Sequence, residues 1–157
     1  MAVTDDLMGL LERAGVAHEL LSHERTERAA AEAEALGIST EDVAKTLVVT
    51  TSAGYVRAVV AGASRLSLAK MRNVLGSPKK QTHLATEDAL SRDYPEFELG
   101  AVPPFGGARS DRVLVDRRVA ERESVVVEAG SHVNSLRLRT ADLIRLTKAE
   151  VVDIEED

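Results

Sequence analysis

The stretch Val43-Ala44-Lys45-Thr46-Leu47-Val48-Val49 decides the fold, because it leads an apolar run into the first arm of a predicted β-hairpin. The arms, Leu47 to Thr51 and Tyr55 to Ala61, are rich in apolar and β-branched residues, and Ser52-Ala53-Gly54 between them is typical of a turn. Strands of this composition are usually buried, so the hairpin is expected to consist of buried strands.

Lys45 is the one cation in this apolar run. A lysine beside a strand that enters the interior either extends its ammonium to solvent or serves chemistry at the mouth of a pocket. The next residue, Thr46, faces either the core or the pocket, because adjacent strand residues point in opposite directions. The residues alone leave these alternatives open.

The remaining chain predicts both helices and strands. Helices are expected to begin at the capping residues Thr4, Thr26, Ser67, Thr86 and Thr140. Extended segments or strands are expected at Val16 to Leu21, Arg112 to Asp116, Ser124 to Glu128, Ser135 to Leu138 and Glu150 to Ile154. Tyr94 to Ser110 holds three of the four prolines and is expected to be an ordered loop. The mixture favours an α+β fold, a mixed β-sheet core surrounded by helices, in one domain over residues 1–157.

Composition excludes several classes of protein. The chain has 157 residues with no Cys, which excludes disulfides, thiolate metal sites and a cysteine nucleophile. Only two Tyr and two Phe are present, which argues against recognition of bases by rows of aromatic rings. No apolar run approaches the length of a membrane span and no secretion signal is evident, so no membrane partner and a cytoplasmic location are expected.

Charge is distributed unevenly along the chain. The net charge is -6, yet residues 51–86 contain six basic residues and no Asp or Glu. One interpretation is a solvated basic surface, and the other is a local face that contacts the phosphates of a nucleic-acid end. The six residues are Arg57, Arg65, Lys70, Arg72, Lys79 and Lys80.

A second segment with catalytic potential is Gly100-Ala101-Val102-Pro103-Pro104-Phe105-Gly106. Its two prolines stiffen the backbone, and its glycines permit close approach to a ligand, although a surface turn has the same composition. Together with Lys45, a loop of this kind suggests a cleft built from a lysine and a rigid backbone segment. No serine-hydrolase elbow, zinc spacing or complete phosphate-loop pattern is present, so neither a metal nor another cofactor is expected.

Several motifs in one order resemble the YbaK/EbsC-type aminoacyl-tRNA deacylases, which are similar to the editing domain inserted in bacterial prolyl-tRNA synthetases. The motifs are Val43 to Val49, Gly100 to Gly106, Val115-Asp116, Ala129-Gly130-Ser131-His132, Leu136-Arg137-Leu138 and Ala141-Asp142-Leu143. The resemblance covers nearly the whole chain. It implies hydrolysis, in trans, of the ester of a mischarged tRNA, with Ala, Cys or Ser as candidate amino acids and tRNA-Pro or a similar tRNA as carrier. The segment Tyr94 to Glu98, which leads into Gly100, differs from the Thr-Gly that many members of the family carry there.

The resemblance also implies the site. Lys45, Gly100 and Ala101 are expected to be catalytic, with Lys45 either anchoring a phosphate or polarising the ester carbonyl. Water is the expected nucleophile, activated by the ribose hydroxyl of the substrate. The expected substrate-binding residues are Thr46, Val102, Pro103, Pro104, Phe105, Gly106, Gly130, Ser131 and His132. The alternative for Gly130 to His132 is a hairpin turn with a surface histidine.

Two other functions remain open at this point. One is a catalytically silent relative that binds tRNA or regulates another enzyme, with an aminoacyl-tRNA synthetase as a candidate partner. The other is a module that binds a free amino acid or a nucleotide. Deacylation assays separate both from the hydrolase.

Overall fold

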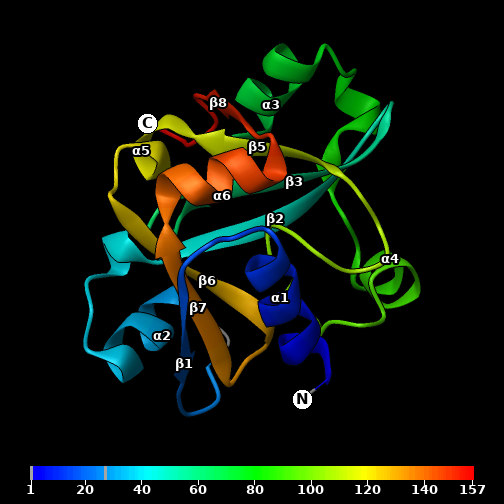
Figure 1. The fold of residues 1–157 in the computed structure, drawn as a ribbon. Helices are drawn as coiled ribbons and strands as arrows, with labels where there is room; N and C mark the ends of the chain where they lie inside the picture. The colour runs from blue at the N-terminus through cyan, green and yellow to red at the C-terminus, as the bar shows by residue number, and fades with distance from the viewer. Residues whose placement is uncertain (1, 27) are drawn as a thin grey trace.

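Two β-sheets form the centre of the molecule, with the five-stranded sheet above the three-stranded sheet in Figure 1. The structure is a computed structural model and describes residues 2–26 and 28–157. The larger sheet has the strand order β4-β2-β3-β5-β8, and the smaller has the order β1-β7-β6. The strands are β1 (His18–Ser22), β2 (Ala44–Thr51), β3 (Gly54–Ala61), β4 (His83–Leu84), β5 (Arg112–Asp116), β6 (Ser124–Ser131), β7 (Asn134–Arg139) and β8 (Glu150–Val152).

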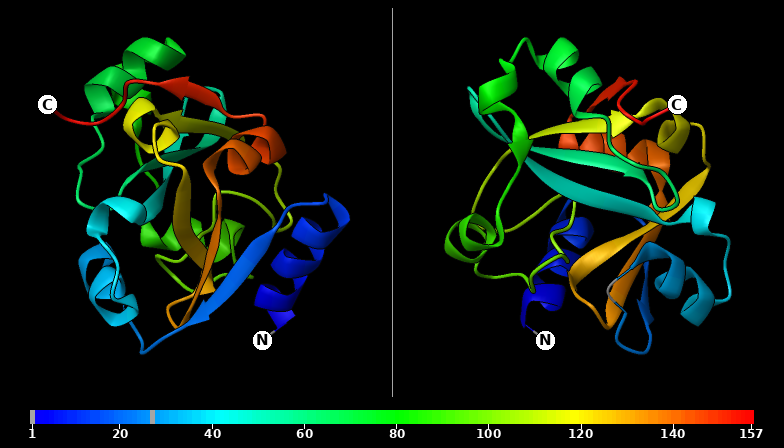
Figure 2. Two further views of the ribbon diagram at one scale, coloured as in Figure 1. Left: turned by 60° about the vertical axis from the view of Figure 1, so that its left-hand side comes forward. Right: turned by 180° about the vertical axis from the view of Figure 1, so that it is seen from behind.

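Helices surround the two sheets, and the termini lie at opposite ends in both views of Figure 2. β3 pairs with β5, and β5 with β8, in parallel, whereas the other pairs in the two sheets are antiparallel. This mixed core confirms the predicted α+β class. The α-helices are α1 (Ala2–Arg13), α2 (Ala29–Leu36), α3 (Leu68–Leu75), α4 (Glu87–Asp93), α5 (Arg117–Ala120) and α6 (Thr140–Thr147), and the 3-10 helices are η1 (Thr40–Asp42) and η2 (Lys79–Gln81).

The predicted hairpin is confirmed at the centre of the larger sheet. β2 and β3 pair without a break from Ala44 opposite Ala61 to Thr51 opposite Gly54. One face of β2 carries Ala44 and Val48 into a core between the two sheets, which also holds Val125 and Leu136 of the smaller sheet. The opposite face packs a second core against α3 and the C-terminal segment, with Val49, Met71 and Ile154 among its members.

Several helix boundaries agree with the capping analysis. The Ser67 side chain accepts a hydrogen bond from the Lys70 amide, and Thr86 accepts one from Ala89. Gly37 ends α2 in the left-handed conformation that glycine adopts without strain.

Three predicted caps are wrong. α1 begins at Ala2, so Thr4 lies inside the helix, where its buried hydroxyl donates to the Ala129 carbonyl. α2 begins at Ala29, after the predicted cap Thr26, and residue 27 between them lies outside the described residues. α6 is preceded by Arg139, and Thr140 is its first residue.

Asp116 joins β5 to the C-terminal segment. Its buried carboxylate accepts hydrogen bonds from the amides of Arg118, Ile154 and Glu155, so it ends the strand, as predicted, and caps α5. The last residues of the chain are thereby fixed beside the larger sheet.

Replacing Asp116 by Ala is expected to lower the free energy of unfolding by about 2–4 kcal/mol, because three amides lose a charged acceptor in a buried site. Denaturant unfolding measures the change. The exposed Glu12→Ala in α1 serves as control and is expected to change the free energy by less than about 0.5 kcal/mol. Equal effects of the two substitutions would contradict the role given to Asp116.

Candidate active site

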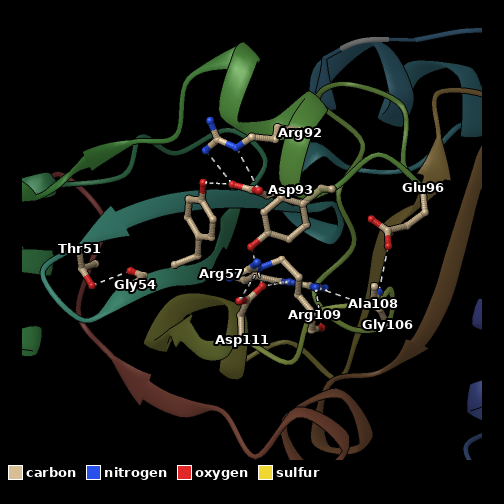
Figure 3. Close-up of polar contacts among 12 residues, drawn as sticks. Thr51, Gly54, Arg57, Arg92, Asp93, Glu96, Gly106, Ala108, Arg109 and Asp111 are labelled. Carbon is tan, nitrogen blue, oxygen red and sulfur yellow. Dashed lines mark hydrogen bonds and ion pairs between the residues drawn. The ribbon is translucent and has the colours of Figure 1, made fainter.

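The loop that follows α4 is held from inside by Arg57 on β3, as Figure 3 shows. The guanidinium is part of a side chain that is 1% exposed. It donates to the carbonyl oxygens of Pro103 at 3.0 Å, Gly106 at 2.9 Å and Arg109 at 3.3 Å. Its Nε donates to the Asp111 carboxylate at 3.1 Å. One planar side chain therefore binds three carbonyls, and the Asp111 carboxylate compensates its charge.

Two tyrosines reinforce this arrangement. The Tyr94 hydroxyl donates to Asp111 at 2.6 Å, and burial together with that carboxylate raises the pKa of Tyr94 above its usual value. The Tyr55 hydroxyl donates to Asp93 at 2.5 Å. The Arg57 guanidinium also lies 5.4 Å from the centre of the Tyr94 ring. The hydrogen bonds from Arg57 constrain the loop. The prediction that Arg57 contacts tRNA is wrong, because its donors are used inside the protein.

Gly100 and His132 line one cavity of about 510 Å³, together with Arg25, Glu98 and Leu99. The His132 side chain is 4% exposed, and its Nε2 donates to the Leu99 carbonyl at 2.6 Å. Its backbone amide donates to the Glu98 carboxylate at 2.7 Å, and that contact, followed by the ion pair with Arg25, lowers the pKa of Glu98. Among the described residues, His132 Nδ1 is buried and has no hydrogen-bond partner.

Gly100 has a φ of +84°, and a side chain added there would meet the His132 ring at 3.5 Å. The Ala101 amide donates to the Glu98 carbonyl at 3.0 Å, whereas within the described chain no hydrogen bond is found for the Gly100 amide. Of the two predicted catalytic amides, Gly100 is therefore the one available to a ligand.

The second half of the loop faces away from this cavity. Val102 and Phe105 belong to the core between the sheets, and Pro103 and Pro104 are also buried. Gly106 lines another cavity of about 500 Å³ on the side of α1. The prediction that these five residues line the same pocket as Gly100 is therefore wrong, because they anchor the loop.

The residues of the Ala129 to His132 motif do not all lie at the same site. Gly130 lies against Phe97 and Val3, and Ser131 is fully buried, so only His132 of the predicted group lines the cavity of Gly100. The alternative of a surface histidine is also wrong, because His132 is buried.

Lys45 and Thr46 point to opposite faces of β2. Lys45 lies opposite Val60, a residue of the second core, and within the described chain it does not line the cavity of Gly100. Burial lowers the pKa of the Lys45 ammonium, Glu155 opposes this effect and Arg65 adds to it. Thr46 is buried, and among the described residues its hydroxyl has no partner.

An isolated β-bridge connects the segment just before Lys45 to β6 of the smaller sheet. Val43 of the β2 lead pairs in parallel with Val126 of β6, so these two side chains project from the same side. Lys45 and Glu128 each lie two residues beyond this single bridge along their own strands. The sequence identified Lys45 but not Glu128.

Four residues on the outer side of the smaller sheet form a polar network that the sequence analysis missed. The hydroxyl of Ser135, on β7, donates to the carboxylate of Glu32, on α2, and lies 2.8 Å from His23 Nε2. Glu128 lies opposite Ser135 in the strand register. Burial, then the charge of Glu32, a hydrogen bond to it and the charge of Glu98 raise the pKa of Glu128 to about 9. An acid inside the apolar run 125–129 was the sequence signal for this network.

The predicted basic face is smaller than expected. Lys70 forms ion pairs with Asp153 at 3.0 Å and Asp157 at 2.9 Å, so its charge is compensated by the C-terminal segment. Arg65, Lys79 and Lys80 are exposed, and Arg72 is partly exposed. Within residues 2–26 and 28–157, no group of His, Asp or Glu is arranged to hold a metal ion and no helix is long and apolar enough to cross a membrane.

Two solved structures have the same fold as this chain. A candidate trans-editing enzyme for prolyl tRNA synthetase matches with a TM-score of 0.88 and 25% identity, over 100% of this chain and 99% of the other. The hypothetical protein APE2540 matches with a TM-score of 0.87 and 27% identity, over 96% and 99% of the two chains. The chain therefore shares its fold with a structure described as a candidate trans-editing enzyme.

The aminoacyl-tRNA editing domain model matches residues 23–146, and the chain belongs to this family. A curated relative, the multifunctional Ser/Thr-tRNA deacylase ProXp-y of Escherichia coli K12, is 26% identical over 94% of this chain and 89% of its own length. The chain is accordingly an aminoacyl-tRNA deacylase, which confirms the activity implied by the motifs.

Replacing Arg57 by Met is expected to lower the free energy of unfolding by about 3–5 kcal/mol, because three loop carbonyls lose their donor and the buried Asp111 carboxylate keeps only the partly exposed Arg109, at 3.6 Å, as its counter-charge. The double substitution Arg57→Met with Asp111→Leu is expected to recover part of the loss, since neither charge then remains unpaired. Denaturant unfolding of the two variants, with the exposed Lys80→Met as control, checks this. A double variant less stable than the single one would contradict the arrangement.

The raised pKa of Glu128 predicts how stability depends on pH. The folded protein holds a proton up to about pH 9 that the unfolded chain releases above about pH 4.5, so this carboxyl contributes stability that is lost as the pH rises through that window. Glu128→Gln is expected to gain stability relative to the wild type across this range. Denaturant unfolding at several pH values measures the difference, and the exposed Glu34→Gln is expected to follow the wild type.

Proposed function

We propose that this deacylase acts in trans on mischarged tRNA and removes small aminoacyl groups, with Ala, Cys and Ser as the candidate substrates and tRNA-Pro or a similar tRNA as the carrier. The observation that carries the proposal is the cavity beside Gly100, where a free amide lies on a loop fixed by buried hydrogen bonds. The similarity to a candidate trans-editing enzyme for prolyl tRNA synthetase supports action in trans.

The proposed reaction is the hydrolysis of an ester by water. Water attacks the carbonyl carbon, the bond from that carbon to the ribose oxygen breaks, one proton of the water passes to the ribose oxygen, and the amino acid leaves as the free acid. The Gly100 amide stabilises the oxyanion of the tetrahedral intermediate, which a preorganised donor does by about 3 kcal/mol. In keeping with the sequence analysis, the ribose hydroxyl of the substrate activates the water.

Lys45 is proposed to bind the terminal nucleotide of the tRNA. Its partial burial strengthens attraction to a phosphate. Arg65, Arg72, Lys79 and Lys80 remain the candidate contacts to the rest of the tRNA.

Lys45→Met is expected to lower kcat/KM for a mischarged tRNA by about tenfold or more, because the charge proposed to bind the terminal nucleotide is lost. Arg145→Met, which removes an exposed charge on α6, serves as control and is expected to keep the wild-type rate. Deacylation of tRNA-Pro charged with alanine, cysteine or serine is the measurement. Failure of the wild-type protein to hydrolyse any of the three would refute the proposed function, and tRNA binding without turnover would favour the catalytically silent alternative.

A further inference from the structure

A second cavity, of about 500 Å³, lies where the C-terminal ends of α1 and α6 meet the loop that follows Gly106, and we call it the α1–α6 cavity. Within the described chain it shares no lining residue with the cavity of Gly100. Its lining concentrates positive charge on a chain whose net charge is -6. The charged lining residues are the bases Arg13, Arg57, Arg109 and Lys148 and the acid Asp111.

The one acid of this lining is compensated from inside the protein. The Asp111 side chain is 5% exposed, and it accepts hydrogen bonds from Arg57 at 3.1 Å and from the Tyr94 hydroxyl at 2.6 Å (Figure 3). Arg57 and Asp111 together therefore carry no net charge. The charge of the cavity is set by Arg13, Arg109 and Lys148, which come from three different elements.

Arg109 is positioned before any ligand arrives. Its guanidinium lies 4.9 Å from the ring centre of Tyr55 and 5.7 Å from that of Tyr94, and its carbonyl accepts a hydrogen bond from Arg57. Its contact with Asp111 is longer, at 3.6 Å, and its side chain is 41% exposed. A planar guanidinium that is fixed yet accessible loses little conformational entropy when it binds an oxyanion.

Lys148 has a backbone conformation that favours glycine. It follows α6 with a φ of 54°, and among the described residues it is the one residue other than glycine with a positive φ. Within the described chain, the side chains of Lys148 and Arg13 have no ion pair or hydrogen bond. Both also lie at helix C-termini, where a cation interacts favourably with the helix dipole. Strain at a cavity nevertheless points to a use for the ammonium.

The rest of the cavity indicates the kind of anion that fits. Leu10, Phe105 and Leu146 form an apolar wall, which a bare inorganic ion would leave without contact. The volume lies within the range of about 300–1,000 Å³ that is typical of sites for small organic molecules. A phosphate monoester has three terminal oxygens and close to two negative charges, whereas a carboxylate has two oxygens and one charge. Three bases therefore match an organic phosphate better than a carboxylate.

We propose that the α1–α6 cavity is a binding site for an organic phosphate monoester, with the phosphate between Arg13, Arg109 and Lys148 and the organic group against the apolar wall. The site is separate from the catalytic cavity, and it does not depend on the proposed function. Two sources share this chemistry, a free nucleotide and the 5′-phosphorylated end of a tRNA.

Calorimetric titration with adenosine 5′-monophosphate at low ionic strength tests the site, and adenosine is the matched ligand without a phosphate. The wild type is expected to bind the nucleotide with a Kd below about 1 mM and adenosine about tenfold more weakly or worse. Arg13→Gln and Lys148→Gly are each expected to raise the Kd of the nucleotide by about fivefold or more. Arg145→Gln, an exposed base on α6, is the control and is expected to change it by less than about twofold.

Lys148→Gly also separates binding from a role in the fold. Glycine relieves the strain of the positive φ, so the denaturant midpoint of this variant is expected to be no lower than that of the wild type, although the nucleotide binds more weakly. A lysine that only stabilised the end of α6 would give the opposite result, a lower midpoint with an unchanged Kd, and this result would overturn the proposal.

Three further results would overturn it. The first is equal binding of the nucleotide and adenosine, which would show that the phosphate is not recognised. The second is equal weakening by Arg145→Gln, which would indicate a general effect of charge. The third is binding that is lost in Lys45→Met but intact in Arg13→Gln and Lys148→Gly, because the nucleotide would then occupy the catalytic site. None of these measurements requires turnover, so a failure of the proposed function is seen separately.

Uncharged tRNA with a 5′-phosphate, compared with the same tRNA bearing a 5′-hydroxyl, distinguishes the two sources. If the tRNA end occupies the cavity, removal of the phosphate weakens binding to the wild type by about fivefold or more, but not to the double variant Arg13→Gln with Lys148→Gly. Equal affinities of the two RNAs, with the nucleotide still bound by the wild type, assign the cavity to a free nucleotide. The site is supported in both cases.

Discussion

The buried guanidinium of Arg57 is the interaction on which the shape of the site depends. It binds three carbonyl oxygens of one loop and one carboxylate, and every partner lies at least 46 residues away in the sequence. Lysine cannot replace it, because a single ammonium on a flexible stem does not present donors in a planar fork. With its second half anchored in this way, the loop presents Gly100 at a fixed place beside His132.

Local patterns predicted those parts of the fold that depend on neighbouring residues. Ser67 and Thr86 cap their helices, and the β2–β3 hairpin has the expected turn, because each of these features is determined within a few residues. Thr4 failed as a cap because its hydroxyl binds Ala129, a contact across 125 positions. Helix propensity describes local preferences and does not include contacts between residues far apart in the sequence.

Long-range contacts also explain what was missed in the site. Arg57 was interpreted as a surface base because residues 51–86 lack acids, yet its carboxylate partner is Asp111. Its position between the apolar residues Val56 and Ala58 was a sign of burial. Glu128 carried a similar signal within Val125 to Ala129, but its partner Glu32 comes from a helix 96 positions earlier, and this distance hides the pair from a sequence pattern.

Selection of a small aminoacyl group requires two different physical devices. A rigid cavity excludes larger side chains by overlap, but it does not reject a smaller one, because an unfilled methylene changes binding by only about 1–3 kcal/mol. A buried acceptor such as His132 Nδ1 adds a polar criterion, since a substrate that offers it no donor leaves it unpaired. The loop that Arg57 anchors and the β6–β7 hairpin tip that carries His132 are different parts of the chain, so the size limit and the polar criterion depend on separate elements.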